Sequence, residues 1–276
     1  MRIVVCIKQV PDTTRVRIDP VTHNLVREGV PSVLNPFDRT AIETALRLRD
    51  EVGGTVCVLS MGPPQAEKEL QLALDLGADR AVLLCSRALG GADTLATSYA
   101  LAQTIRELGF DLILCGNEAI DGCTGQVGPA IGEHLAIPSF TCVDEISLEG
   151  DTLILRRDTG KSLDTWRTAL PAVACLLRAQ ATRTPSPSQR RPEQMDASHL
   201  EEERIGSRGS PTRVAAISTS ERQSNLLEVD YRWSLDERME YIFNGGLVSK
   251  GTKLTLGPAE KQATLIRDKL TGGAGA

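Results

Sequence analysis

The hydrophobic residues of the chain up to residue 177 fall into short apolar runs separated by longer stretches with helical spacing. The runs are typical of strands buried on both faces, and they predict strands at 3–10, 55–60, 80–85, 112–115 and 171–177. The intervening stretches predict helices that start at 35–38, at 65, at 95 and at 126, the last ending at Pro138. This alternation predicts an α/β fold with a right-handed, doubly wound, Rossmann-like parallel sheet. We expect the first strand at its centre.

Two segments depart from this alternation. Residues 12–34 alternate charged and apolar positions, and 16–18 with 25–27 predict a β-hairpin inserted before the first helix. A second hairpin is predicted from 141–148 and 152–156 around the turn Glu149-Gly150-Asp151.

The hydrophobic pattern weakens after residue 180. Between 179 and 213 the chain has four prolines, six arginines and a run of three glutamates, so little can be buried there. This composition predicts a linker, or an arm lying on a partner. Residues 235–247 have weak helical spacing and are expected to pack on something else. The predicted organisation is an α/β domain over 1–180 and a C-terminal arm and tail over 181–276.

Composition excludes several classes of protein. Apolar residues make up 41% and aromatic residues only 3%, which suits a core of aliphatic side chains better than an aromatic platform for nucleic acid. The net charge of −5 argues against affinity for nucleic acid or for anionic membranes. No run approaches the length of a membrane-spanning helix, and the N-terminus lacks a signal-peptide cleavage site. We therefore expect a cytoplasmic protein without direct membrane insertion.

The cysteines and histidines give no signal for a metal site. Five of the seven cysteines lie inside apolar runs, and no C-x-x-C pair occurs: Cys6, Cys57, Cys85, Cys115 and Cys175. They are expected to be buried thiols of a reducing compartment. The sequence also lacks a P-loop, a G-x-S-x-G motif and a Ser/His/Asp grouping, so no catalytic residue is predicted.

The candidate chemistry lies after the fourth apolar run. A loop of small residues leads from Gly116 into the helix that starts at Gln126. Glycines allow a close approach of the backbone, and a helix N-terminus favours an anion. We therefore predict a nucleotide diphosphate site formed by Asp121, Gly122, Cys123, Thr124, Gly125, Gln126, Val127 and Gly128. The alternative is a strand–helix connection with Thr124 as helix cap and no ligand, for which this loop is long.

Two other loops are expected at the same edge of the sheet, because ligands of doubly wound sheets lie at the carboxyl ends of the strands. The first is predicted to contact adenosine, or else to form an ordinary helix start capped by its asparagine: Asn35, Pro36, Phe37 and Asp38. The second is predicted to contact a cofactor, with a cap at Asp93 as the alternative: Asp93, Thr94 and Thr97. Cys6 and Met61, at the ends of the first two strands, are expected either to flank the adenine or to pack in the core.

Several of these segments resemble one protein family. Residues 3–12, 34–37, 114–122 with Gln126, and 210–212 are similar to the matching segments of electron transfer flavoprotein beta subunits. The resemblance covers essentially the whole domain and implies the adenine-nucleotide alpha-hydrolase-like form of the fold. It also implies a heterodimer with an alpha subunit that holds FAD. Such a heterodimer carries electrons between an acyl-CoA or similar flavin dehydrogenase and a downstream acceptor.

The resemblance leaves two cofactors open for this chain. In the respiratory type the beta subunit holds a structural AMP, and in the electron-bifurcating type the same pocket holds a second FAD and receives NADH. Residues 90–98 and the 121–129 loop resemble the bifurcating type, which implies FAD here and NAD(H) binding in the heterodimer. AMP without a redox role in this chain is the alternative.

The chain departs from the family pattern at three places. Cys123 stands where an acidic residue is usual, and Asn117-Glu118 replaces a basic residue followed by glutamine. Loss of that cation weakens the case for bifurcation more than the case for FAD. In the arm, Arg190 and Arg191 follow 185–188 where the family's docking loop has a leucine and a lysine run. The partner dehydrogenase is therefore left open.

Overall fold

The computed structural model describes residues 1–12, 17–18, 25–26, 31–212, 233–234 and 236–239. The chain divides into one compact unit over Met1–Ile217 and a second over Ser218–Ala276. In the second unit the described residues 236–239 are helical. The rest of the helix expected over 235–247 lies outside the described residues.

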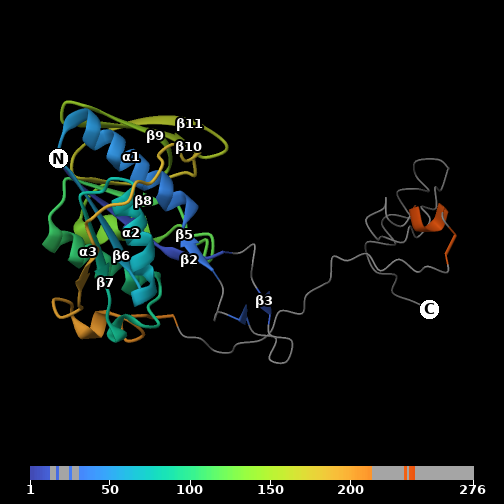
Figure 1. Cartoon of the computed structure of the whole chain (residues 1–276). Helices are drawn as coiled ribbons and strands as arrows, with labels where there is room; N and C mark the ends of the chain where they lie inside the picture. The colour runs from blue at the N-terminus through green and yellow to red at the C-terminus, as the bar shows by residue number, and fades with distance from the viewer. Residues whose placement is uncertain (13–16, 19–24, 27–30, 213–232, 235, 240–276) are drawn as a thin grey trace, which may run out of the picture. The chain divides into compact units, whose positions relative to one another are not determined.

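A nine-stranded sheet runs through the first unit (Figure 1). In spatial order its strands are β11 (Leu163–Ala169), β10 (Thr152–Asp158), β9 (Ser139–Glu149), β12 (Ala172–Leu176), β8 (Leu112–Gly116), β1 (Arg2–Ile7), β6 (Thr55–Met61), β7 (Arg80–Leu84) and β13 (Glu193–Met195). The pairs from β9 to β13 are parallel, whereas β9, β10 and β11 pair antiparallel. The predicted α/β fold with a doubly wound, mostly parallel sheet is therefore confirmed, and β1 is the middle one of the strands from β9 to β13 that pair parallel.

Helices cover both faces of this sheet. The helices α1 (Pro36–Val52) and α2 (Glu67–Asp75) contribute to one core cluster, and α3 (Thr94–Leu108) and α4 (Val127–Leu135) to the other. Along β1, Val5 faces the first cluster while Val4 and Cys6 face the second. Because both faces are buried, this strand is apolar at successive positions. Short 3-10 turns precede α2 (Pro64–Ala66), follow β7 (Arg87–Leu89) and lie at Glu202–Arg204.

The predicted first strand, 3–10, is divided at Lys8. The strand β2 (Gln9–Pro11) leaves the large sheet and pairs with β5 (Ser32–Leu34). The break has a local cause: the Lys8 amide donates to Asp38 Oδ2 at 2.7 Å, so the run of strand residues stops at Ile7. Between β2 and β5, the predicted hairpin is confirmed by the antiparallel pair β3 (Arg17–Ile18) and β4 (Leu25–Val26).

The second predicted hairpin is confirmed as β9 and β10, but the pattern gave no sign of β11. Its side chains are exposed or half-buried throughout, with Trp166 47% exposed. An edge strand with no buried face lacks the alternation by which strands are recognised. Backbone pairing with β10 holds it in place instead.

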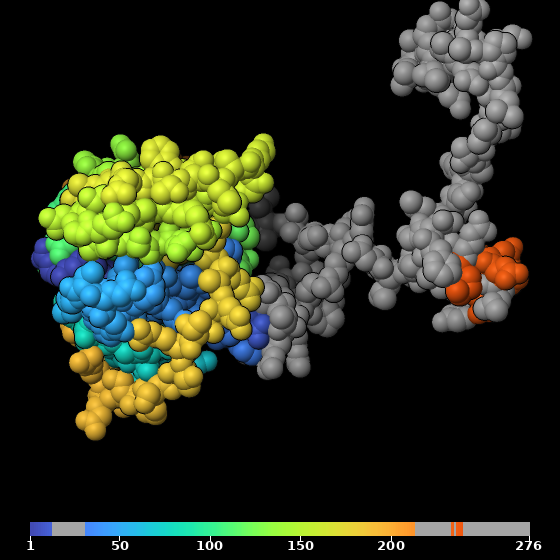
Figure 2. All heavy atoms as spheres, turned by 90° about the horizontal axis from the view of Figure 1, so that it is seen from above, coloured from blue at the N-terminus to red at the C-terminus, as the bar shows by residue number. Residues whose placement is uncertain are grey.

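The segment predicted as an arm lies on the domain itself over much of its length. Figure 2 shows it (gold) running along α1 (blue). The amides of Ser186 and Ser188 donate to Asp75, to its carbonyl at 2.7 Å and its Oδ1 at 2.9 Å. Farther on, β13 joins the sheet beside β7. The compact unit thus continues past the boundary expected at residue 180.

Candidate functional site

The strand order reverses between β1 and its neighbour β8. The chain moves outward from β1 to β6 and β7, then returns to β8 on the other side of β1. At such a switch point the loops that follow the two strands separate and leave a crevice at their carboxyl ends. The loop from Gly116 to Gln126 and the start of α1 meet here.

The 116–126 loop begins with a close contact that requires glycine. A Cβ on Gly116 would lie 2.2 Å from Asp38 Oδ1 and 2.7 Å from Phe37 Cβ. The loop then turns through Cys123 and Gly125, which have φ of 49° and 60°. Most of the predicted diphosphate residues are exposed: Asp121, Gly122, Cys123, Thr124 and Gln126. The backbone of this stretch is therefore accessible to a ligand.

The helix that follows the loop starts without a side-chain cap. Its N-cap residue is Gln126, so Thr124 is not the cap that the alternative interpretation expected. Gln126 Oε1 instead accepts a hydrogen bond from Thr94 Oγ1 at 3.1 Å. The first turn of α4 carries no acidic residue, and the helix is nine residues long. Its first amides and its dipole consequently favour an anion.

The neighbouring helix α3 starts differently, because Asp93 caps it. Asp93 Oδ1 accepts from the amides of Leu95 and Ala96 at 3.0 and 3.1 Å. Its other oxygen accepts from the Thr212 amide at 3.2 Å. Burial would raise the pKa of Asp93, but these hydrogen bonds hold it below its ordinary value. The cap expected as the alternative for Asp93 is thus present.

The two threonines of this helix lie differently. Thr94 joins the starts of α3 and α4 through its bond to Gln126. Thr97 is half-buried on the next turn, and its amide donates to the Asp93 carbonyl at 2.9 Å. Of the two, Thr94 is the one that the structure brings to the 121–128 loop.

The Asn35 side chain holds the loop in place and does not cap α1 as predicted. Its Nδ2 donates to the Glu118 carbonyl at 2.9 Å, and its Oδ1 accepts from the Ile120 amide at 3.3 Å. The residue is 1% exposed. Its Nδ2 also donates to Asp38 Oδ1 at 2.9 Å, but the two bonds to the loop join groups more than eighty residues apart in sequence, which a local capping pattern could not reveal. Pro36 and Phe37 of the same segment are half-buried and stay partly accessible.

Asp38 lies beneath the loop with its carboxylate fully hydrogen-bonded. Its Oδ2 accepts from the Lys8 amide at 2.7 Å, and its Oδ1 from the Gly116 amide at 3.2 Å. Burial raises the pKa of Asp38 to about 7, against the opposing effect of its hydrogen bonds. The residue is 5% exposed, so the structure places it as a support of the site.

Lys8 was not among the predicted site residues. Its Nζ lies 2.8 Å from both carboxylate oxygens of Asp121. The sequence feature that could have identified Lys8 is its position immediately after the central strand, because side chains there point to the edge of the sheet where ligands bind. The pair places beside the predicted diphosphate loop a lysine whose charge is balanced by Asp121.

The remaining predicted residues lie at the ends of β1 and β6. Cys6 is 7% exposed and packs in the α3/α4 core cluster. Met61 is half-buried against the same cluster. All seven cysteines are free. Cys115 and Cys175 are buried with Cys6 as expected, whereas Cys57 and Cys85 are only half-buried. No group of three His, Cys, Asp or Glu side chains within the described part of the chain is arranged to hold a metal ion.

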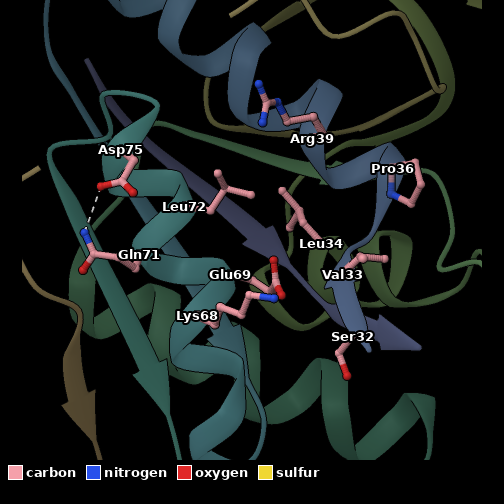
Figure 3. Close-up of a pocket in the computed structure, with 10 residues that line it drawn as sticks. All are labelled: Ser32, Val33, Leu34, Pro36, Arg39, Lys68, Glu69, Gln71, Leu72 and Asp75. Atoms are coloured by element: carbon pink, nitrogen blue, oxygen red, sulfur yellow. Dashed lines mark hydrogen bonds between the residues drawn. The ribbon is translucent and has the colours of Figure 1, made fainter. Parts of the chain in front are cut away.

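A hollow of about 700 Å³ lies elsewhere, between β5, the start of α1 and α2 (Figure 3). Its lining includes Val33, Leu34 and Leu72 together with the charged Lys68 and Glu69. Of the predicted site residues it includes Pro36. It belongs to the α1/α2 layer, whereas the two helix starts of the candidate site belong to the α3/α4 layer.

Comparison with known proteins gives consistent matches. Residues 22–201 match the family described as Electron transfer flavoprotein domain. The chain is 46% identical over 254 residues to electron transfer flavoprotein subunit beta of Thermoanaerobacterium thermosaccharolyticum, covering 88% of this chain and 98% of that protein. It is 58% identical over 157 residues to the same subunit of Clostridium acetobutylicum, covering 57% and 61%.

A third relative has a more specific name. The chain is 50% identical over 179 residues to the caffeyl-CoA reductase-Etf complex subunit CarD of Acetobacterium woodii, covering 64% of this chain and 67% of that protein. In the structure itself, none of the helices in the described ranges is long and apolar enough to cross a membrane.

Proposed function

Because this chain belongs to the electron transfer flavoprotein family, as one of its beta subunits, we propose that it binds FAD at the 121–128 loop and passes electrons within a heterodimer with an alpha subunit. Bound FAD would supply the redox chemistry, and this chain would bind and orient it. The donor or acceptor would be an acyl-CoA or similar flavin dehydrogenase. The similarity to a subunit of a caffeyl-CoA reductase complex supports a CoA-ester enzyme as partner.

The observation that carries the proposal is the uncapped start of α4 at the switch point of the sheet. The exposed loop before it offers backbone amides, and Gly125 has the positive φ that lets the chain curve around a ligand. A Cβ on Gly122 would meet nothing within 4 Å, so there is open space at the loop. A diphosphate fits this combination of dipole, amides and space.

The predicted residues take separate roles in this proposal. The amides of Val127 and Gly128 bind phosphate oxygens, and Lys8, which is paired with Asp121, borders the same loop. Pro36, Phe37 and Met61 border the adenosine side, with Cys6 beneath. Thr94 and Thr97 border the ribityl chain and the flavin ring. Asp93 caps α3 and thereby holds these threonines in position. Asn35 and Asp38 hold the loop in shape without touching the ligand.

The proposal includes NADH-linked electron bifurcation, with structural AMP as the alternative in the same pocket. An adenylate is common to AMP and FAD, so the adenosine and phosphate contacts serve both. The small and hydroxyl side chains at 90–98 favour the bulkier cofactor. We further propose that the tail beyond residue 212 contacts the alpha subunit, and that the heterodimer works in the cytoplasm, where its free thiols remain reduced.

The test is the nucleotide content of the co-purified heterodimer after acid release, measured by chromatography against FAD and AMP standards. Two FAD per heterodimer and no AMP are the expected result. One FAD and one AMP would overturn the flavin assignment and leave a structural nucleotide at the same loop. A single FAD with no AMP would contradict any nucleotide site in this subunit.

A further inference from the structure

Three thiols lie side by side on the sheet, and two of them, Cys115 and Cys175, face the first turn of α4. Cys6, Cys115 and Cys175 occupy matching positions on the neighbouring strands β1, β8 and β12. All three belong to the core cluster on the α3/α4 face, with exposures of 7%, 5% and 0%. The strands therefore present a row of small side chains to the helix, next to the edge where the candidate site lies.

The helix approaches this row through a glycine. A Cβ on Gly128 would lie only 2.2 Å from Cys175 Sγ, whereas the next nearest atom, Cys115 Cβ, would be 3.6 Å away. One turn later Gly132 repeats the arrangement, since its Cβ would lie 2.9 Å from the Cβ of Ser139 on β9. The helix thus rests on the sheet with a backbone-to-side-chain contact at each of two turns, which is possible only without a Cβ.

We propose that Gly128 and Cys175 form a matched steric pair that sets how closely the start of α4 approaches the sheet, and thereby positions its amides for a nucleotide phosphate. This inference rests on the proposed function. Cys175 is a positioning residue, because it is fully buried and acts through Gly128. The pair also maintains the bond between Gln126 and Thr94, which a displaced α4 would stretch.

The chemistry of Cys175 suits a space-filling role. Its contact with the Cys115 thiol, and then its burial, raise the pKa of Cys175 well above the ordinary value. A neutral, inaccessible thiol is a poor nucleophile and a poor target for oxidants. The size of the sulfur atom, and not its reactivity, therefore matters here.

The experiment uses the heterodimer stripped of nucleotide, with AMP as the probe in isothermal titration. Gly128→Ala adds the clashing Cβ and should weaken AMP binding about tenfold, because overpacking displaces the helix start. Alanine is the better helix former, so propensity cannot explain a loss. Cys175→Ala alone removes the sulfur that supports the helix start but adds no clash, so it should weaken AMP binding less than Gly128→Ala does. The double variant should bind AMP as Cys175→Ala does, because the Sγ is gone and the nearest atom is then at 3.6 Å.

The matched control is Gly132→Ala, the same change one turn along the same helix. It should lower the melting temperature through its contact with Ser139 while AMP affinity stays within about threefold of wild type. Equal losses of affinity in the two glycine variants, or no rescue by Cys175→Ala in the double variant, would overturn the pairing while the nucleotide site stands. Wild-type heterodimer that binds neither AMP nor FAD at this subunit would overturn the proposed function, and the pairing with it.

Discussion

Asp38 shows how a single residue can serve the site without touching a ligand. It receives the amides at the ends of β1 and β8, so one carboxyl group joins the two strands between which the sheet order reverses. Asn35 adds the connection to the 118–120 backbone. Both side chains are buried, and their removal should alter the conformation of the 116–126 loop more than the packing of the core.

Asp38 also gives a prediction for stability against pH. Its pKa is about 7 in the folded chain and near 3.9 when unfolded, so between these values the folded state holds more protons. Stability contributed by this group is full below pH 4 and is lost as pH rises toward 7, by about 1.4 kcal/mol per pH unit. The measurement is the free energy of unfolding in urea of wild type and of Asp38→Asn, each at pH 5 and at pH 7. The change in this free energy between the two pH values should differ between the two proteins.

The expected outcome is a wild-type stability that falls more steeply with pH than that of Asp38→Asn over this range. His134, whose pKa is lowered mainly by burial, titrates with the opposite sign, but it is common to both proteins and cancels. Equal slopes in the two proteins would show that Asp38 is ionised throughout.

At the level of elements, the two helices that meet at the site have unequal starts. The α3 start is closed by Asp93, which also fastens 210–212 through the Ser210 hydroxyl and the Thr212 amide. The α4 start is open. An anion is thereby directed to α4, because the first amides of α3 already have a carboxylate partner.

The cap can be tested by substitution. Asp93→Ala should destabilise the protein by about 1–2 kcal/mol, since both the α3 amides and the Thr212 amide lose their acceptor. Asp93→Asn keeps one acceptor oxygen and should cost less. The control is Ser86→Ala, which removes the exposed cap of the Arg87–Leu89 turn and should change unfolding in urea by less than half as much. Equal effects at the two positions would contradict the role of Asp93.

At the scale of the whole molecule, the segment after β12 becomes part of the domain. It follows α1, bonds to the end of α2 and supplies the edge strand β13. The ion pair of Arg80 with Glu193 is about half exposed at both ends and contributes little by itself. Backbone pairing and contacts along the segment hold it instead.

Hydrogen exchange tests this docking. The amides of Ser186 and Ser188 should exchange slowly in the native heterodimer, because both donate to Asp75. Asp75→Ala removes the side-chain acceptor and should speed exchange at Ser188 by about tenfold, with a smaller effect at Ser186, whose acceptor is the backbone carbonyl. Fast exchange at both amides in wild type would contradict the docked arrangement.

The sequence by itself determined the layers of the fold and indicated the loop at which we propose a nucleotide site. Side chains that are buried in the core must be apolar, and their spacing along the chain follows the period of the strand or helix. The apolar stripes of the helices and the apolar runs of five strands could therefore be recognised locally: β1, β6, β7, β8 and β12. The small-residue loop before α4 could also be recognised locally, because glycines mark positions where the backbone needs conformational freedom or a close approach.

Only the tertiary structure decided which polar groups are already satisfied and which remain open. The bonds from Asn35 to the 118–120 backbone, from Gly116 to Asp38 and from Thr212 to Asp93 join residues far apart in the chain, and hydrogen bonding to distant groups leaves no periodic trace in the sequence. The same holds for β11 and β13, which pair through the backbone, and for the Gly128–Cys175 contact, whose two residues meet only when α4 lies on β12. Hydrophobic periodicity is local, whereas hydrogen-bond partnership and steric fit depend on the assembled fold.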